Sequence, residues 1–203
     1  MLKIETVVCG DLEENAYIVS APGAQEVMVV DPGDDEAALL RAIGSRRVAC
    51  VCLTHAHFDH MLAAARLIKD GAPLYVGAGD LAALNDERLN LYSPALARLP
   101  APRGLRAQTY AAALHAAGMT FAVVDTPGHT PGGVCLYEKD EGVLISGDTL
   151  FEAGYGRVDF PGSDPEKMRD SLQKLFALPG ETRVYPGHGR ATTIARERAR
   201  YGR

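Results

Sequence analysis

The sequence has no long hydrophobic run and no recognisable leader segment. No stretch approaches the ~20 consecutive apolar residues that a membrane-spanning helix needs. The N-terminus, "MLKIETVVCGDLEENAYIV", lacks a basic region leading into a long apolar segment, which is the pattern of a secretory signal. These absences predict a cytoplasmic protein that does not enter the membrane.

Cysteine is also scarce, and its four copies are scattered along the chain at Cys9, Cys50, Cys52 and Cys135. Such spacing argues against a disulfide framework and agrees with a reducing compartment. Cys50 and Cys52 stand two residues apart in "VACVCLT", so a strand would point both side chains to one face. A C-x-C pair can bind metal, but buried free thiols are more common, and we predict free thiols here.

Positive charge is not in excess, since the formal net charge is -5. The surface therefore has no overall attraction for a phosphate backbone or an anionic membrane. The one arginine-rich stretch, "ARERARYGR" at the C-terminus, is predicted to be an exposed helix. We expect a small molecule as the partner, and neither nucleic acid nor a membrane.

The chain has 203 residues, of which 47% are apolar and 23% charged, as in ordinary globular domains. We predict one mixed α/β domain over residues 1–203. Helices are expected over 34–43, in "MLAAARLIKDG", and in "DPEKMRDSLQKLFAL", where Asp164 would be the N-cap and Pro165 the first helical residue. Residues 86–114 have no stable period, which indicates a loop or a broken helical insert that could serve as a lid.

The stretch "THAHFDH" is followed by further metal-binding residue types, each placed where a strand-like run ends. Glycine precedes three of these residues, where it would allow a sharp turn and a close approach of the backbone. Because side chains at the ends of neighbouring strands meet in one crevice, we expect them to converge. The full set comprises His55, His57, Asp59, His60, His129, Asp148 and His188.

Five imidazoles and two carboxylates suit zinc, iron or manganese, whereas calcium and magnesium prefer oxygen ligands. Seven ligands are too many for one tetrahedral ion with an open position, so two ions sharing a carboxylate are expected. Taken singly, Asp59 is equally typical of a helix N-cap, and Asp148 in "SGDT" is typical of a turn. The joint occurrence favours a metal centre. His115, in "AAALHAAG", has no such setting and is predicted to be structural.

The motifs "THAHFDH", "TPGHTPGG", "ISGDTLF" and "YPGHG", in this order, resemble those of the metallo-β-lactamase superfamily across nearly the whole chain. The resemblance implies a four-layer αβ/βα sandwich with the metals at one edge of two sheets. It also implies the ligand sets: His55, His57 and His129 for one ion, and Asp59, His60 and His188 for the other. Asp148 would bridge the two ions.

Within that superfamily, "GDTLFEAGYGRVDF" is similar to the Gly-x-Gly-basic stretch of glyoxalase II-like hydrolases and persulfide dioxygenases. The resemblance places Tyr155 and Arg157 at the substrate, with Arg157 at the position that helps hold glutathione. An exposed loop arginine is the alternative for Arg157. The departure lies at the C-terminus, because glyoxalase II proper has a further helical domain after the last histidine, whereas this sequence continues only to Arg203. True β-lactamases usually lack an aspartate at the place of Asp148, so antibiotic hydrolysis is not expected.

The expected activity is therefore hydrolysis of small thioesters or esters by a dinuclear centre, with zinc as the expected metal and iron or manganese as alternatives. Asp59 would hold the second ion and orient the attacking hydroxide. A mononuclear iron persulfide dioxygenase is the alternative of another reaction class; its ligands by resemblance would be His55, His129 and Asp148. A lactonase and a non-catalytic metal-binding domain are the remaining alternatives.

Overall fold

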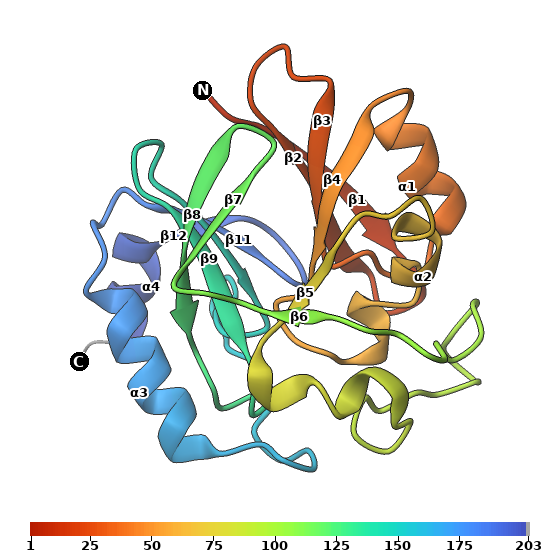
Figure 1. Ribbon diagram of the computed structural model, residues 1–203. Coiled ribbons are helices and arrows are strands. Elements are labelled where there is room, and N and C mark those ends of the chain that lie inside the picture. The colour runs from red at the N-terminus through yellow and green to blue at the C-terminus, as the bar shows by residue number, and fades with distance from the viewer. Residues whose placement is uncertain (202–203) are drawn as a thin grey trace.

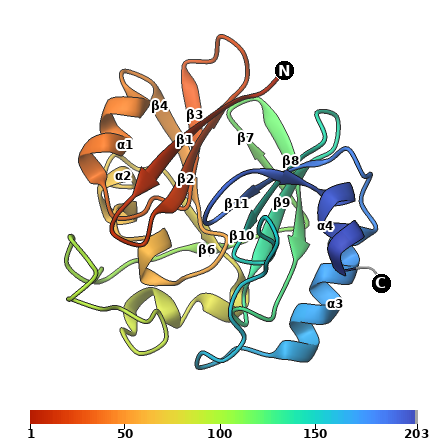
Figure 2. The same ribbon diagram turned by 180° about the vertical axis from the view of Figure 1, so that it is seen from behind.

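Side chains alternate along the central strands, and this alternation produces a fold of four layers. The computed structural model describes residues 1–201. In it Tyr17, Met28 and Cys52 pack into a core shared with Phe121 and Ile145 of the second half of the chain. Their neighbours in sequence point the other way, to helices on the outside, as period-two backbone requires. Two sheets therefore lie face to face with helices outside both, as predicted (Figures 1 and 2).

The first sheet uses the first half of the chain, with strands in sequence order. The second strand pairs antiparallel with the first and with the third, and β3, β4, β5 and β6 are parallel. The strands are β1 (Lys3–Cys9), β2 (Glu14–Ser20), β3 (Glu26–Val30), β4 (Arg47–Cys52), β5 (Leu74–Val76) and β6 (Gln108–Thr109). Helices α1 (Glu36–Ile43) and α2 (Ala64–Leu67) cover its outer face (Figure 1).

The second sheet uses the second half of the chain, again in sequence order, and only β10 and β11 pair in parallel. Its strands are β7 (Ala113–Ala116), β8 (Met119–Asp125), β9 (Val134–Glu138), β10 (Val143–Gly147), β11 (Arg183–Pro186) and β12 (Thr192–Thr193). Helices α3 (Pro165–Phe176) and α4 (Ile194–Tyr201) cover its outer face (Figure 2).

The predicted helices are present, with one large difference in length. Helix α3 begins at Pro165, and the Asp164 side chain accepts hydrogen bonds from the amides of Glu166 and Lys167, as expected of an N-cap. Helix α1 begins two residues later than predicted, after Asp35 as its N-cap. Helix α2 has only four residues, because the preceding chain forms a 3₁₀ turn, η1 (Phe58–His60), instead of continuing as α-helix.

The segment over 86–114 is a loop for most of its length, as expected. Its end differs from the prediction, because β6 pairs with β5 and β7 pairs with β8. His115 lies on β7, bonded to the Thr120 hydroxyl at 3.0 Å and away from the other histidines, which agrees with a structural role.

The cysteines and the arginine-rich C-terminus also agree with the sequence. All four thiols are free and buried, and the sulfurs of Cys50 and Cys52 lie 3.7 Å apart on one face of β4. The arginine-rich stretch forms α4 with its arginines largely exposed; its last two residues lie outside the described chain. None of the helices within residues 1–201 has the length and apolar character needed to cross a membrane.

Candidate metal centre

The site forms where four strands end at the same edge of the two sheets. Strand β4 leads into the loop that carries His55, His57, Asp59 and His60, and β8, β10 and β11 are followed by single candidate ligands. The seven predicted residues are thus brought together, four from the first sheet and three from the second. The side chains of both sheets meet in one crevice, as expected for strand ends in α/β proteins.

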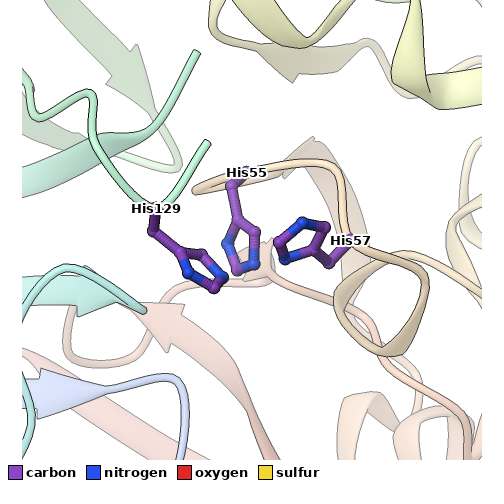
Figure 3. A group of neighbouring side chains, drawn as sticks. All are labelled: His55, His57 and His129. Atoms are coloured by element: carbon purple, nitrogen blue, oxygen red, sulfur yellow. The ribbon is translucent and has the colours of Figure 1, made fainter. Parts of the chain in front are cut away.

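The first group consists of His55, His57 and His129. Their potential ligand nitrogens all lie within 4.8 Å of one another, and all three residues are buried. Figure 3 shows the three rings side by side, two from the loop after β4 and one from the loop after β8. An extended backbone at His57 keeps it on the same side as His55.

The second group consists of Asp59, His60 and His188, whose ligand atoms also lie within 4.8 Å of one another. The His188 Nε2 atom is 3.4 Å from an Asp59 carboxylate oxygen. Asp59 and His60 both lie in the 3₁₀ turn η1, and the His60 ring remains next to His55 of the first group, with 4.1 Å between the ring centres.

Asp148 lies between the two groups. One of its oxygens is 3.4 Å from His129 Nε2 in the first group, and the other is 3.4 Å from His60 Nε2 in the second. A carboxylate in this place has the geometry of a ligand shared by two ions.

Hydrogen bonds behind the rings set the direction of three histidines. Nδ1–H of His60 donates to an Asp31 oxygen at 3.1 Å, Nδ1–H of His129 to the Arg157 carbonyl at 2.8 Å, and Nδ1–H of His188 to the Leu12 carbonyl at 3.0 Å. Because each Nδ1 carries its hydrogen toward an oxygen, Nε2 is the nitrogen that faces the centre and can bind a metal. This arrangement is typical of metal-ligating histidine.

The ring atoms that face the centre are left without partners. Buried Nε2 atoms of His55, His60 and His129 and the Oδ1 atom of Asp148 have no hydrogen-bond partner within the described chain. Burying unpaired polar atoms is costly, and a cation is the ligand that would satisfy nitrogen lone pairs and carboxylates at once. The residues present therefore fit divalent transition metals.

The pKa values of His55 and His57 in the first group and of His60 in the second group shift in opposite directions. Burial lowers the pKa of His57 to about 3 and that of His55 well below its usual value, with the neighbouring histidines adding to the effect. Burial would also lower the pKa of His60, but the carboxylates of Asp148, Asp59 and Asp31 outweigh it and raise the value to about 10. Hence His55 and His57 of the first group are neutral, whereas His60 of the second group is protonated in the metal-free protein.

Asp31 was missed by the sequence reasoning, and it is a positioning residue. It lies within 4.8 Å of possible ligand atoms of His55 and His60. Its oxygens, however, already accept hydrogen bonds from the backbone and hydroxyl of Thr54 and from His60. It therefore orients His60 from behind. The signal was its position in "VVDPG", directly after β3 at the same edge.

Asp80 was missed as well. Its buried carboxylate accepts hydrogen bonds from the amide of Ala56, from the hydroxyl of Thr130 and from the amide of Gly132. Ala56 lies between two ligands of the first group and Thr130 follows the third. Asp80 thus ties the two loops of the first group together, although no local pattern in the sequence indicated it.

A third connection joins strand β2 to the loop of His188. The Asn15 amide donates to the carbonyls of Pro186 and Gly189, and the Tyr17 hydroxyl donates to Pro186 at 2.6 Å. Strand β2 belongs to the first sheet and His188 to the second, so these bonds fix the two sheets together beside the second group. The sequence showed Asn15 and Tyr17 only as strand residues.

The glycine before His188 is required by close packing. A Cβ atom on Gly187 would lie 2.2 Å from Asp148 Oδ1 and 2.7 Å from the His60 ring. No side chain fits there without displacing the bridging carboxylate, in agreement with the expected close approach of the backbone.

The sequence matches the family model "Metallo-beta-lactamase superfamily" over residues 9–188, a span that contains every residue of both groups. The chain belongs to this superfamily.

Two relatives in the superfamily carry names that bear on function. The chain is 31% identical to the "Probable metallo-hydrolase YqgX" of Bacillus subtilis, with 97% of this chain and 94% of that protein covered. It is 33% identical to a "Hydroxyacylglutathione hydrolase" of Ectopseudomonas mendocina, over 85% of this chain and 60% of that protein. The superfamily and these names support a metal-dependent hydrolase.

Two solved structures of the superfamily match nearly end to end. One is TTHA1623 "in a di-iron-bound form", with a TM-score of 0.84, 37% identity, and 95% and 96% of the two chains covered. The other is the "BLEG-1 B3 metallo-beta-lactamase", also with a TM-score of 0.84, at 34% identity over 98% and 97% of the chains. The fold of this chain is therefore that of the superfamily, and a member with this fold binds a dinuclear metal centre.

In this protein, a cavity of about 560 Å³ opens over the candidate metal centre. His57, Asp59, His129, Asp148 and His188 form its floor. Both residues predicted to contact the substrate lie on its wall: Tyr155 and Arg157, in the loop between β10 and α3. The loop over 86–107 contributes Leu91 and Leu96 to the lining of the cavity, so this segment borders the site.

Proposed function

We propose that the protein is a dinuclear metal-dependent hydrolase of small thioesters or esters, of the hydroxyacylglutathione hydrolase type. The observation that carries the proposal is the pair of three-residue groups with Asp148 between them. His55, His57 and His129 would hold one ion, and Asp59, His60 and His188 the other. Zinc is the proposed metal, and iron and manganese suit the same ligands.

When bound, the ions would polarise the substrate carbonyl and make water acidic enough to attack near neutral pH. The remaining chemistry belongs to the chain. Water attacks the carbonyl carbon, the bond from carbon to sulfur or oxygen breaks, and an acid and a thiol or alcohol leave. Asp59 faces the cavity with its carboxylate and orients the attacking water. Tyr155 and Arg157 contact the part of the substrate that lies beyond the carbonyl.

The four buried free thiols support a reducing, cytoplasmic setting, which is part of the proposal. The similarity to BLEG-1 adds a β-lactam to the substrates worth testing beside thioesters, esters and lactones.

His188 distinguishes this function from a mononuclear iron dioxygenase. A dioxygenase with ligands from His55, His129 and Asp148 does not need His188, whereas the second ion of a hydrolase does. We expect His188→Ala to remove one of two bound ions and at least ~100-fold of the thioesterase activity, the scale of losing one electrostatic element of a preorganised site. Metal analysis, a thioester assay and an oxygen electrode with glutathione persulfide measure both outcomes.

His115→Ala is the matched control, because this sixth histidine lies away from the centre. It should keep both ions and full activity. Saturation of the wild type at one ion, or persulfide-dependent oxygen consumption by both wild type and His188→Ala, would contradict the dinuclear hydrolase.

A further inference from the structure

The positive charge at the wall of the cavity is already paired. Arg157 donates from Nε to one Asp159 oxygen at 2.9 Å and from Nη2 to the other at 2.8 Å. The same guanidinium lies over the Phe160 ring, 4.2 Å from its centre. Both side chains of this pair are 65% exposed, and the bidentate bonds together with the stacking favour one orientation of the guanidinium, with its charge opposed by a carboxylate.

No lysine and no second arginine is available to an anionic ligand there. Within residues 1–201, Arg157 is the one lysine or arginine on the wall of this cavity. Arg98, in the neighbouring loop over 86–107, is likewise paired with a carboxylate, that of Asp11. A substrate carboxylate can bond only to the N–H groups of Arg157 that Asp159 does not use, and the negative charge of Asp159 beside them repels it.

The other wall residues are mostly apolar. They come from three separate segments and surround the space above the metal ligands: Leu12, Leu91, Leu96, Phe151, Tyr155 and Phe160. Leu12, Leu96 and Tyr155 are partly exposed, with 38%, 42% and 46% of their surface open to solvent. An apolar group that covers them removes this surface from water.

We propose that the site selects thioesters whose acyl and thiol parts are apolar and uncharged, and that Asp159 determines this specificity by neutralising Arg157. The inference rests on the proposed hydrolase function and specifies its substrate class. In this role Arg157 serves as a flat wall of the cavity. The protein would share the reaction of a hydroxyacylglutathione hydrolase but differ in its thiol carrier, because the anionic glutathione is a poor partner here.

Two thioesters with the same acyl group test the proposal: the hexanoyl thioesters of N-acetylcysteamine, which is uncharged, and of glutathione, which is anionic. We expect the zinc-loaded wild type to have a kcat/KM at least tenfold higher for the uncharged thioester. Lengthening the acyl chain from acetyl to hexanoyl should raise kcat/KM by up to roughly fourfold per buried methylene.

In Asp159→Asn the guanidinium of Arg157 should lose its negatively charged partner. For the glutathione thioester we expect kcat/KM to rise at least fivefold, through a lower KM, and the gain to shrink as salt screens the interaction. For the uncharged thioester kcat/KM should change less than twofold. Asp170→Asn is the matched control, since it removes the same charge from an exposed position on α3, and it should change neither value.

Binding of unreactive thioethers separates a failure of this inference from a failure of the hydrolase proposal. Calorimetry with S-hexyl-N-acetylcysteamine and S-hexylglutathione should show the same preference and the same effect of Asp159→Asn without any turnover. If fully metallated protein hydrolyses neither thioesters nor esters, the hydrolase proposal fails, and the thioether preference still decides the binding inference. Tighter binding of S-hexylglutathione to the wild type, an unchanged preference in Asp159→Asn, or no binding of either thioether would overturn it.

Discussion

The direction of His60 depends on an aspartate that does not face the cavity. Asp31 accepts hydrogen bonds from Thr54 and from His60 Nδ1, and so fixes which nitrogen of His60 faces the centre. Partners of this kind, behind a metal ligand, typically contribute a factor of about 10–100 in metal affinity. The strength of the second metal position should therefore depend on Asp31.

In Asp31→Asn one of the two acceptor oxygens becomes an NH₂ donor, so either Thr54 or His60 loses its acceptor. We expect zinc binding at one of the two positions to weaken roughly 10–100-fold. Competition with a chelator measures both affinities. Asp34→Asn is the control, because Asp34 is an equally buried carboxylate that bonds the backbone of Leu99 away from the metals. Equal zinc affinity in Asp31→Asn and the wild type would contradict the positioning role.

Glu14 is a buried carboxyl group whose two oxygens have no hydrogen-bond partner within the described chain. Burial, with nearby acidic groups, raises its pKa well above the usual 4.5. The folded protein thus keeps Glu14 neutral where the unfolded chain ionises it, which reduces stability as the pH rises above 4.5.

Glu14→Gln removes this cost while keeping the shape of the side chain. We expect the Tm of the metal-free variant to exceed that of the wild type at pH 8, with the difference shrinking toward pH 4.5. Thermal melts across this range measure it. A variant less stable than the wild type at pH 8 would mean that Glu14 is charged in the fold.

At the scale of single residues, the sequence was informative about the candidate metal ligands. It was uninformative about the residues that hold those ligands in place through hydrogen bonds. That the seven candidate ligands lie close together could be predicted because each follows a strand-like run and because the motif "THAHFDH" has one-residue spacing. Asp80, Asn15 and Tyr17 could not be, because each bonds to residues far away in sequence. A contact across two sheets leaves no periodicity in either segment.

At the scale of elements, the loop over 86–107 shows why irregular segments resist prediction. It contains no repeating apolar pattern, yet both Arg98 and Leu99 donate backbone hydrogen bonds to the Asp34 carboxylate. The loop is thus held by a side chain from the loop after β3, and its leucines reach the cavity. The start of helix α3, by contrast, is indicated within its own sequence by the N-cap Asp164 and by Pro165. Its first residue was therefore predicted correctly.

The start of α3 also supports the first metal group. Asp164 caps the helix, and its own amide donates to the carbonyl of Gly128, next to His129, at 2.8 Å. We expect Asp164→Ala to lower the free energy of unfolding by about 1 kcal/mol, the usual cost of losing an N-cap. Asp170→Ala, in the exposed middle of the helix, should change it by less than about 0.5 kcal/mol. Urea unfolding of both variants decides this, and equal stability would show that the cap is dispensable.

For the whole molecule, pH should act differently on the two metal positions. His60, with a pKa of about 10, is protonated at neutral pH in the metal-free fold, so protons compete with a cation at the second group. His57, with a pKa of about 3, stays neutral. As pH falls from 8, we expect the second group to lose zinc before the first, and metal retained per chain to pass through one ion.

The raised pKa of His60 also predicts how the stability of the metal-free protein depends on pH. The protonated His60 stabilises the fold fully below its unfolded pKa of about 6.5, and this contribution is lost as the pH rises through about 10. The Tm of the metal-free protein should therefore fall between these values more than that of His60→Gln. Identical pH profiles of the two proteins would refute the assignment.

Each half of the chain builds one sheet with its own helices, and each three-residue metal group takes ligands from both halves. A chain interrupted near residue 111, between β6 and β7, would thus yield two fragments that each carry an incomplete set of ligands for both ions. Association of the fragments would complete both sets at once. Metal should therefore lower the dissociation constant of the two fragments by the factor with which it stabilises the assembled protein. Metal bound at the centre would hold the two fragments together, and zinc concentration would control whether a split version of the protein assembles.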